Sequence, residues 1–448
     1  MLEEISKFFN EAEKHLTKCS LNNWDIYVAK QQSRSISYRQ SAIEDFEENI
    51  DLGWAIRILK DSRISMIYGN SFSDVEKNIE KAEFMLRYMT ENPHFKMNKE
   101  LNIPADNKLL DMSINARSIA VKVDSLAQLE SMIYKEQSSI KQIESLSFSE
   151  SFSQGYYRTA YSDILTEEAV HYGYSAEAIA EDNSGQEAGS WYSYKTRLDE
   201  LNILDIAQKT AYNAYSMLGS KPVSSGHYTV IMNNDVFAHF LATFADLFSA
   251  DKVQNKKSVL RDKLGEQIAS SIFKLTDDPT LAGELGSMSF DGEGTATAVT
   301  KLIDAGALSG YLYDLKTASK DGVASTGNAL RSSYQGSPLI TPTNLVVGKG
   351  SSTFDKMINI DEENYLVINN VMGMHTANSV NGDFSVGATG YLYSRGKCIK
   401  PVKQITIAGN FLTMLTDIMD IADNSENFPL HGNIITPAIK IKKLMVSG

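Results

Sequence analysis

Hydrophobic and polar residues alternate with a period of two between residues 24 and 68. Because successive side chains of a strand point to opposite faces, this period predicts an antiparallel meander with one buried face. The apolar positions fall into three runs: Trp24, Ile26 and Val28; Trp54, Ile56 and Ile58; Ile64, Met66 and Tyr68. The acidic residues between the runs indicate a solvated edge rather than a metal cluster: Glu44, Asp45, Glu47 and Glu48.

Two helices are predicted after the meander. Ser73 and Glu76 have the spacing of a capping box, and Pro93 is expected to end the first helix. Its apolar positions recur at helical spacing: Val75, Ile79, Ala82, Leu86 and Met89. Residues 93–115 lack any period and predict a long surface connection, and a second helix is expected over residues 116–137. Both helices would cover one side of the first sheet, the second through Leu126, Leu129 and Ile133.

Strand-like segments rich in Ser and Tyr resume over residues 143–196, and a further helix is predicted over 199–218 with Gly219 as its C-terminal stop. This order suggests a duplicated layout, although no residue-level repeat is visible. Beyond residue 280, where 19 of the 28 glycines lie, short β-type runs alternate with turns. The predicted fold class is α+β: an N-terminal domain (1–222) with helices packed on an antiparallel sheet, followed by a β-rich C-terminal domain (223–448).

Composition narrows the classes of function. The 448 residues suffice for two domains with separate cores. Two cysteines, Cys19 and Cys398, are typical of a reducing cytosol and exclude a Cys-rich zinc module. A net charge of −13 disfavours nucleic acid as a partner, and IKIKK (439–443) predicts a strand with an exposed basic face. No apolar stretch approaches about 18 residues and no basic leader is present, so we expect a cytoplasmic protein without membrane contact.

The stretch NDVFAHFLATFADLF (234–248) predicts a buried helix that carries one histidine, His239. A zinc-hydrolase helix needs two histidines one turn apart and a Glu beside the first, but the position four residues after His239 is Thr243. None of the seven histidines belongs to an HExxH or HExxxH arrangement, and the chain lacks a nucleophile elbow, a Walker A loop and a dinucleotide-binding glycine motif. The sequence therefore predicts no catalytic residue and no metal site in this chain.

Polar residues on glycine turns of the C-terminal half are the candidates for substrate binding. They are Asp291 and Glu293 in FDGEGT, Asn328 and Arg331 in STGNALR, Asn344 in TPTNL, His375 in GMHT, and Asp383 in NGDFSVGA. Such a cluster on a β scaffold can line a cleft, whereas each residue taken singly is also a common turn or capping residue. His375 is the strongest candidate because its GMH context would hold an imidazole close to neighbouring backbone.

These segments resemble the TldD/PmbA family, also called modulators of DNA gyrase, and specifically its PmbA/TldE branch. The resemblance is carried by residues 290–318 (FDGEGTATAVTKLIDAGALSGYLYDLKTA), 325–331 (STGNALR), 341–350 (TPTNLVVGKG), 373–392 (GMHTANSVNGDFSVGATGYL) and 401–410 (PVKQITIAGN). Their order and spacing match, and the N-terminal meander followed by a helix also fits. The resemblance implies an N-terminal α+β domain joined to a β-rich C-terminal domain, assembled as a dimer.

The resemblance also implies a division of labour. In the family, TldD carries HExxxH on a helix and a late Cys as a further zinc ligand, and it cleaves peptides together with TldE, which lacks those residues. Here the corresponding helix offers His239 alone, and the tail ENFPLHGNIITP (426–437) contains no Cys. The expected role is a non-zinc subunit that shapes the peptide chamber for an HExxxH partner, with zinc in that partner and a peptide or unfolded polypeptide as substrate.

Two other functions stay open at this point. One is a homodimeric peptide-binding protein without protease activity. The other is an enzyme that uses His375, Asp383 and Asp291 without zinc, although no spacing among them supports a nucleophile and base pair. The acidic composition gives no support to a mechanism that acts on DNA.

Overall fold

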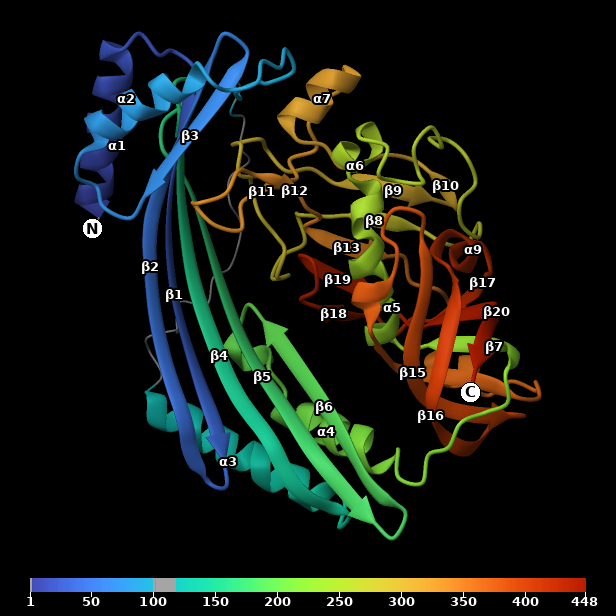
Figure 1. The fold of residues 1–448 in the computed structure, drawn as a ribbon. Coiled ribbons are helices and arrows are strands. Elements are labelled where there is room, and N and C mark those ends of the chain that lie inside the picture. Colours follow the sequence, from blue (N-terminus) through green and yellow to red (C-terminus); the bar gives the residue numbers. More distant parts are fainter. Residues whose placement is uncertain (1, 100, 102–117) are drawn as a thin grey trace.

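The structure is a computed structural model that describes residues 2–99, 101 and 118–448. Its N-terminal part is a long, curved antiparallel sheet in the order β3-β2-β1-β4-β5-β6 (Figure 1). The strands are β1 (Trp24–Arg39), β2 (Ala42–Lys60), β3 (Arg63–Gly69), β4 (Ile140–Thr159), β5 (Leu165–Asp182) and β6 (Gly185–Lys195). The predicted meander and the predicted strands over residues 143–196 are therefore confirmed, and they form one sheet.

The two faces of this sheet differ in chemistry because side chains alternate along each strand. Even-numbered positions of β1, β4 and β5, such as Ile26, Phe148 and Tyr172, are buried under helices. Odd-numbered positions carry serines such as Ser33, Ser149 and Ser175, and these side chains face the C-terminal part of the chain. The sheet thus has a helix-covered apolar face and a polar face.

Helix pairs cover the two ends of the apolar face (Figure 1). Helices α1 (Leu2–Lys18) and α2 (Val75–Leu86) pack on β1 to β3, and α3 (Ile119–Glu136) and α4 (Ile203–Tyr215) pack on β4 to β6. The helix predicted over 199–218 is shorter than expected. The 3₁₀ turn η2 (Leu198–Glu200) precedes it, and Asn202 caps α4 because its side chain accepts from the N–H groups of Leu204 and Asp205. Gly219 follows in the left-handed conformation with φ 70°.

The predicted capping box of α2 is wrong. Asp74 is the N-cap with φ 57°, and no side chain caps the helix. Glu76 instead accepts a hydrogen bond from Lys18 of α1 at 3.0 Å, so a tertiary ion pair has replaced the local cap. The helix ends at Leu86, well before Pro93. The start of the second predicted helix at 116 and most of the predicted connection 93–115 lie outside the described residues.

The acidic group of residues 44–48 lies on β2, where all ten residues from Ala42 to Asp51 are exposed. Glu48 accepts hydrogen bonds from Arg34 at 2.9 Å and from Gln32 at 3.2 Å. Within the described residues no group of three or more His, Cys, Asp and Glu side chains is placed to hold a metal ion. The interpretation of these acids as a solvated edge is confirmed.

The chain leaves the first sheet after α4, and the C-terminal part begins with β7; the predicted boundary at 222/223 lies between the two. One sheet has the order β16-β15-β14-β7-β20-β17, and an added β16–β20 pairing closes five of its strands into a ring. These strands are β7 (Gly226–Met232), β14 (Tyr365–Met372), β15 (Asp383–Ser394), β16 (Lys397–Asn410), β17 (Ile418–Ile421) and β20 (Ile439–Ser447). The predicted strand IKIKK is part of β20.

A second sheet packs beside it in the order β10-β9-β8-β13-β19-β18, and β11 pairs with β12. The strands are β8 (Leu275–Asp277), β9 (Thr300–Asp304), β10 (Ala307–Leu308), β11 (Ala329–Leu330), β12 (Leu339–Ile340), β13 (Asn344–Val347), β18 (Glu426–Phe428) and β19 (Asn433–Thr436). Short helices connect them: α6 (Ala250–Gln254), α7 (Leu315–Asp321), α8 (Phe354–Ile358), α9 (Phe411–Thr416) and η4 (Met374–Thr376). The predicted α+β class is confirmed.

The helix predicted over 234–248 is α5 (Asn234–Phe244), extended by the 3₁₀ turn η3 (Ala245–Phe248). Its phenylalanines at 237, 240, 244 and 248 are fully buried in the largest apolar core, which contacts both C-terminal sheets. This core covers the apolar helix without a second subunit. None of the helices in the described residues is long and apolar enough to cross a bilayer.

Candidate functional site

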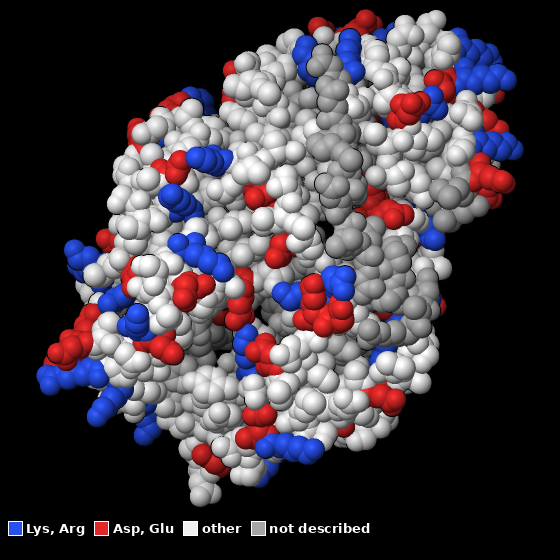
Figure 2. Space-filling model, turned by 180° about the vertical axis from the view of Figure 1, so that it is seen from behind, with Lys and Arg blue, Asp and Glu red and all other residues white. Residues whose placement is uncertain are grey.

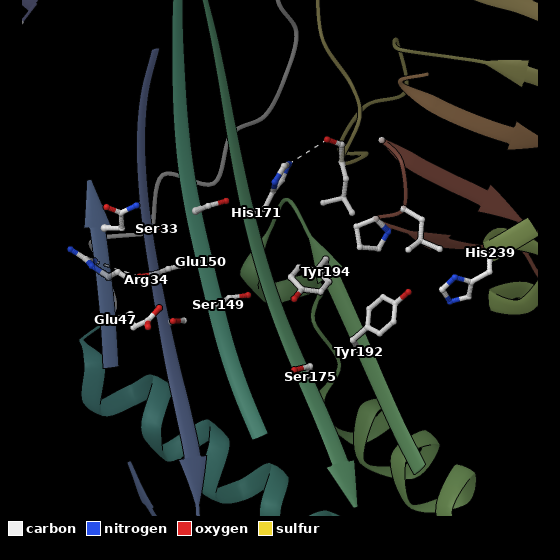
Figure 3. A pocket seen from close by; sticks show the side chains of 17 residues that line it. Ser33, Arg34, Glu47, Ser149, Glu150, His171, Ser175, Tyr192, Tyr194 and His239 are labelled. Atoms are coloured by element: carbon white, nitrogen blue, oxygen red, sulfur yellow. Dashed lines mark hydrogen bonds and ion pairs between the residues drawn. The ribbon is translucent and has the colours of Figure 1, made fainter. Parts of the chain in front are cut away.

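The polar face of the long sheet and the C-terminal part enclose a cavity of about 730 Å³ (Figure 3). The floor combines short hydroxyl side chains from β1, β4 and β5 with Glu47 and Asn49 of β2, and the Oγ atoms of Ser147 and Ser175 lie 2.7 Å apart beside it. The opposite wall is apolar and comes from loops of the C-terminal part, with Leu285, Pro429 and Leu430. A cavity with one hydrogen-bonding floor and one apolar wall suits an amphiphilic, elongated ligand.

Aromatic and imidazole side chains stand at the side of this cavity. Tyr192 and Tyr194 come from β6, and Tyr192 points toward the wall that carries His239 (Figure 3). The hydroxyl of Tyr192 is buried and has no hydrogen-bond partner among the described residues. Burial, with a smaller contribution from the nearby Asp235 carboxyl, raises the pKa of Tyr192 to about 12. Tyr192 is therefore a neutral hydroxyl that can donate to a ligand at neutral pH.

His239 faces the cavity from α5 and is half-buried. Burial lowers the pKa of its imidazole below the ordinary 6.5, so the ring is neutral at pH 7. One helical turn earlier, Asp235 is also half-buried, and desolvation raises the pKa of its carboxyl to about 7. The expectation that His239 sits in a core or an interface is incomplete, because the structure also exposes it to the cavity.

His171 closes the gap between the sheet and the C-terminal part. Its Nε2 atom lies 3.3 Å from the carbonyl oxygen of Leu285, so Nε2 carries the proton in this contact (Figure 3). On the far side of His171 a second hollow of about 390 Å³ begins, and it shares Ser151, His171 and Leu285 with the cavity. The two spaces adjoin along the sheet on either side of the His171–Leu285 contact, and together they are called the cleft.

The second hollow is lined by two of the sequence-predicted site residues, Asp291 and Arg331. The Asp291 carboxylate accepts from the backbone N–H groups of Glu293, Thr295 and Ala329, each at 2.9 Å. Burial raises the pKa of Asp291 to about 7. These three bonds saturate the carboxylate, so Asp291 holds the turn that precedes the hollow.

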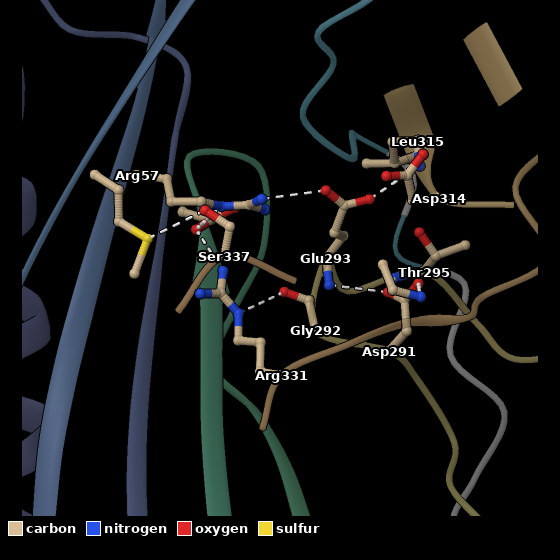
Figure 4. A network of polar contacts seen from close by, with 12 residues as sticks. Arg57, Asp291, Gly292, Glu293, Thr295, Asp314, Leu315, Arg331 and Ser337 are labelled. Atoms are coloured by element: carbon tan, nitrogen blue, oxygen red, sulfur yellow. Dashed lines mark hydrogen bonds and ion pairs between the residues drawn. The ribbon is translucent and has the colours of Figure 1, made fainter. Parts of the chain in front are cut away.

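Arg331 and Glu293 belong to a buried ionic network between the two parts of the chain (Figure 4). Arg57 of β2 binds Asp25 of β1 through Nε at 2.9 Å and through a short Nη2 contact, and its Nη1 donates to Glu293 at 3.1 Å. Arg331 donates from Nε to the carbonyl of Gly292 at 2.9 Å, lies 3.4 Å from Asp25, and stacks over a tyrosine ring of β1. The network fixes the C-terminal part on the sheet.

The other predicted site residues do not converge on the cleft. Asn328 and Asn344 are buried, and their amides donate to Asp277 at 2.7 Å and to the carbonyl of Asp278 at 2.8 Å respectively. His375 lies exposed on η4, and the exposed Asp383 accepts from the amides of Asn381 and Asn410. Neither of these two lines the cavity or the second hollow.

The residues that the sequence reasoning missed are His171, Tyr192, Tyr194 and the serines of the floor. The signal was present in the polar alternation of residues 143–196, above all from Ser145 to Thr159, where every second residue is small or hydroxylated. A polar alternation also suits a solvent-facing sheet, so it could not reveal that a second domain encloses this face.

Comparisons with known proteins agree along nearly the whole chain. Residues 225–448 match the PmbA/TldA metallopeptidase C-terminal domain, residues 24–86 match domain 1, and residues 113–218 match the central domain. An uncharacterised protein of Methanocaldococcus jannaschii is 29% identical over 428 residues, which cover 93% of this chain and 95% of that protein. Metalloprotease PmbA of Escherichia coli O157:H7 is 24% identical and covers 95% of this chain and 92% of its own length.

Two solved structures have the same fold. A Thermotoga maritima protein named for modulation of a DNA gyrase superposes with a TM-score of 0.90 at 26% identity, over 99% of this chain and all of that one. TldE from Thermococcus kodakarensis superposes with a TM-score of 0.90 at 20% identity, with coverage of 99% and 100%. With three matched domains in the family's order, the chain belongs to the PmbA/TldD metallopeptidase family.

Proposed function

We propose that this chain is the non-zinc, TldE-like subunit of a cytoplasmic TldD/TldE-type peptidase. Its cleft holds an extended stretch of peptide or unfolded polypeptide beside a zinc-bearing HExxxH partner, which performs the hydrolysis. The proposal rests mainly on α5, because this helix presents one imidazole to the cleft, whereas a zinc-hydrolase helix needs two. A homodimeric peptide-binding protein without protease activity is the alternative.

The metal that the family name implies does not fit the described residues of α5. Asn234 uses its amide to donate to the carbonyl of Thr436 at 3.0 Å and to the carbonyl of Asn424, so it is a structural residue. Asp235 is partly exposed and its carboxyl has a pKa raised to about 7, and His239 stands alone on the cavity side. A catalytic zinc needs three protein ligands in tetrahedral arrangement. The described part of the chain has no such set, and no step of hydrolysis is assigned to it.

The cleft supports binding of an extended chain. A strand advances about 3.3 Å per residue and points side chains alternately to both sides, so one side of a bound peptide would face the serines and the other Leu285 and Leu430. Tyr192, Tyr194 and neutral His239 add hydrogen-bonding groups that do not depend on the charge of the ligand. In this proposal the long sheet supplies the floor on which the extended peptide lies.

Metal analysis and reconstitution test the proposal. The purified chain should contain no stoichiometric zinc after dialysis and should not hydrolyse peptides alone, whereas a mixture with an HExxxH homologue should hydrolyse them until a chelator is added. Light scattering should show assembly with that homologue. One tightly held zinc per chain, or hydrolysis by the isolated chain that survives the chelator, would refute the non-zinc role.

Variants of the cleft decide which residues contact the peptide. Tyr194→Ala and His239→Ala should raise KM of the reconstituted pair by about tenfold and leave assembly intact. His375→Ala tests the sequence-based site against the cleft, because the structure places His375 outside it. If His375→Ala reduces turnover and both cleft variants do not, the substrate lies elsewhere. Peptide binding by the isolated chain with no effect of a partner would favour the homodimeric alternative.

A further inference from the structure

Strand β2 has a free edge over most of its length. It pairs with β3 only from Trp54 to Lys60, and no strand in the described residues pairs with the same edge between Ala42 and Gly53. In Figure 1, β3 accompanies only one end of β2. About half of these twelve residues turn their N–H and C=O groups away from β1, as the antiparallel pattern requires. Such an edge is a template for another strand.

The free edge of β2 carries different chemistry on its two faces. Asp45, Glu47 and Asp51 lie opposite Ser37, Ser35 and Gln31 of β1, which places them on the polar face beside the cleft. Ile43, Phe46 and Ile50 are 47%, 40% and 60% exposed. Phe46 lies opposite the buried Ile36, so it belongs to the helix-covered face, where its own side chain stays partly exposed.

Asp45 and Glu47 of the polar face are available for a partner, whereas Asp51 already accepts from the hydroxyl of Tyr334 at 3.3 Å. Neither Asp45 nor Glu47 forms an ion pair within the described residues, and residues 42–53 contain five acids and no Lys or Arg. Glu48 is different because it lies on the other face and is neutralised by Arg34. A strand added to this edge therefore meets a row of negative charge on one side and a row of apolar side chains on the other.

A second copy of this chain does not complement that edge. Pairing β2 with itself would bring ten carboxylates into one two-stranded ribbon without a cation, and like charges on opposite strands are destabilising. The strand of this chain that alternates Ile and Lys, residues 439–441 of β20, is paired with β7 on one edge and with β17 on the other. It is therefore not free to dock on another copy.

We infer that the β2 edge from Ala42 to Gly53 is a docking site for an extended segment of a different polypeptide, in which Lys or Arg alternates with apolar residues. The basic side chains lie beside Asp45, Glu47 and Asp51, and the apolar side chains lie beside Phe46 and Ile50. The edge borders the cleft, because Glu47 and Asn49 also line the cavity and Asp51 lines the second hollow. The inference still goes beyond the proposed function, because it concerns the unpaired backbone of β2 and a different polypeptide from the one held on the floor of the cleft. The inference also accounts for the exposed apolar side chains of β2, which solubility alone would not require.

The test measures binding of short labelled peptides to the full chain by fluorescence anisotropy. A capped nine-residue peptide that alternates Lys and Val should bind, and its affinity should fall steeply with added salt. A peptide that alternates Glu and Val, and one with the five Lys and four Val in separate blocks, are the matched controls. Both should bind at least tenfold more weakly, the first for its charge and the second for its pattern.

Variants of the protein locate the bound peptide. Asp45→Lys with Glu47→Lys, and separately Phe46→Ser with Ile50→Ser, should each weaken binding about tenfold or more, with unchanged circular dichroism. Asp163→Lys, a charge reversal at an exposed acid outside β2, should leave binding unchanged. Equal binding to the wild type and both edge variants would overturn the inference, as would loss of binding with Tyr194→Ala alone. Self-association that the edge variants abolish would assign the edge to a second copy instead.

Discussion

Arg57→Met removes a buried cation from the network that joins the long sheet to the C-terminal part. Arg57 is 5% exposed at its side chain, and its partners Asp25 and Glu293 are 0% and 9% exposed. Methionine is similar in length and apolar, so the change leaves little cavity but takes the counter-charge from two carboxylates. Burial already raises the pKa of Glu293, with Arg57 as the largest opposing influence. The variant therefore makes the Glu293 carboxyl harder to ionise and removes the guanidinium that lies 2.9 Å from Asp25.

The magnitude follows from what remains after the substitution. Asp25 keeps two long contacts, Tyr157 at 3.3 Å and Arg331 at 3.4 Å, and Glu293 keeps the N–H group of Leu315 at 2.9 Å. Removing one partner of a buried ion pair costs about 3–5 kcal/mol. The matched control is Arg63→Met on the neighbouring strand, where Arg63 and Glu91 are 34% and 62% exposed and form a pair at 3.1 Å. An exposed pair contributes about 0–1 kcal/mol.

Urea unfolding followed by tryptophan fluorescence and by far-ultraviolet circular dichroism measures both variants. Two probes are needed because a chain with more than one domain can unfold in more than one transition. Trp24 and Trp54 lie in the core under α1 and α2, so the fluorescence reports on the sheet that holds Arg57. Arg57→Met should lower the free energy of unfolding more than Arg63→Met does. If the difference between the two variants is below about 1 kcal/mol, the network is not a significant source of stability.

Three further predictions concern single residues. Asp235→Asn should stabilise the fold, because the wild-type carboxyl has a pKa of about 7 in the folded chain against 3.8 when unfolded, so its favourable contribution is full below about pH 4 and is lost as the pH rises through 7. The stability gained by the variant in urea unfolding should therefore grow by up to about 1.4 kcal/mol per pH unit between those limits and then level off. A gain that does not depend on pH would contradict this. Gly189→Ala should destabilise the fold by about 3 kcal/mol or more, because a Cβ there would lie 2.1 Å from the backbone nitrogen of Ala214 in α4. The control Gly387→Ala, whose Cβ would meet its first neighbour at 3.7 Å, should cost under about 1 kcal/mol. Equal melting temperatures for the two variants would show that α4 can shift freely. The imidazole of His239 should titrate below pH 6.5 in an NMR experiment with His239→Gln as the assignment control, and a midpoint above 6.5 would mean that the ring is solvated or paired with an acid.

Regular alternation made the long strands predictable from the sequence. The runs that begin at Trp24, Trp54 and Ile64 fall in β1, β2 and β3, because a period of two over several residues fits a half-buried strand and little else. The helix cap at Ser73 failed for a physical reason: its partner Glu76 binds Lys18, which is 58 residues earlier in the chain. A local motif cannot reveal a distant competitor for the same carboxylate.

The candidate site was predictable only in part. Arg331 and Asp291 do line the second hollow, yet most of their polar groups are taken up by the ionic network and by backbone N–H groups. Within the described residues, Nη1 of Arg331 is buried without a hydrogen-bond partner. His171 carries no sequence motif, and its position matters because the Leu285 carbonyl meets it across the cleft. Cleft residues of this kind depend on the packing of two parts of the chain, which neither periodicity nor spacing encodes.

The register of β1 has a consequence for synthesis on the ribosome. Its first partner, β2, follows it at once, but its second partner, β4, pairs Thr159 with Asp25 and emerges more than a hundred residues later. At about 5–20 residues per second, the inner edge of β1 stays without its partner for roughly 10 s. During that interval the serines at 33, 35 and 37 keep one face of the waiting strand polar. The hydroxyls that later floor the cleft thus also reduce the risk that the unfinished sheet pairs with another nascent chain.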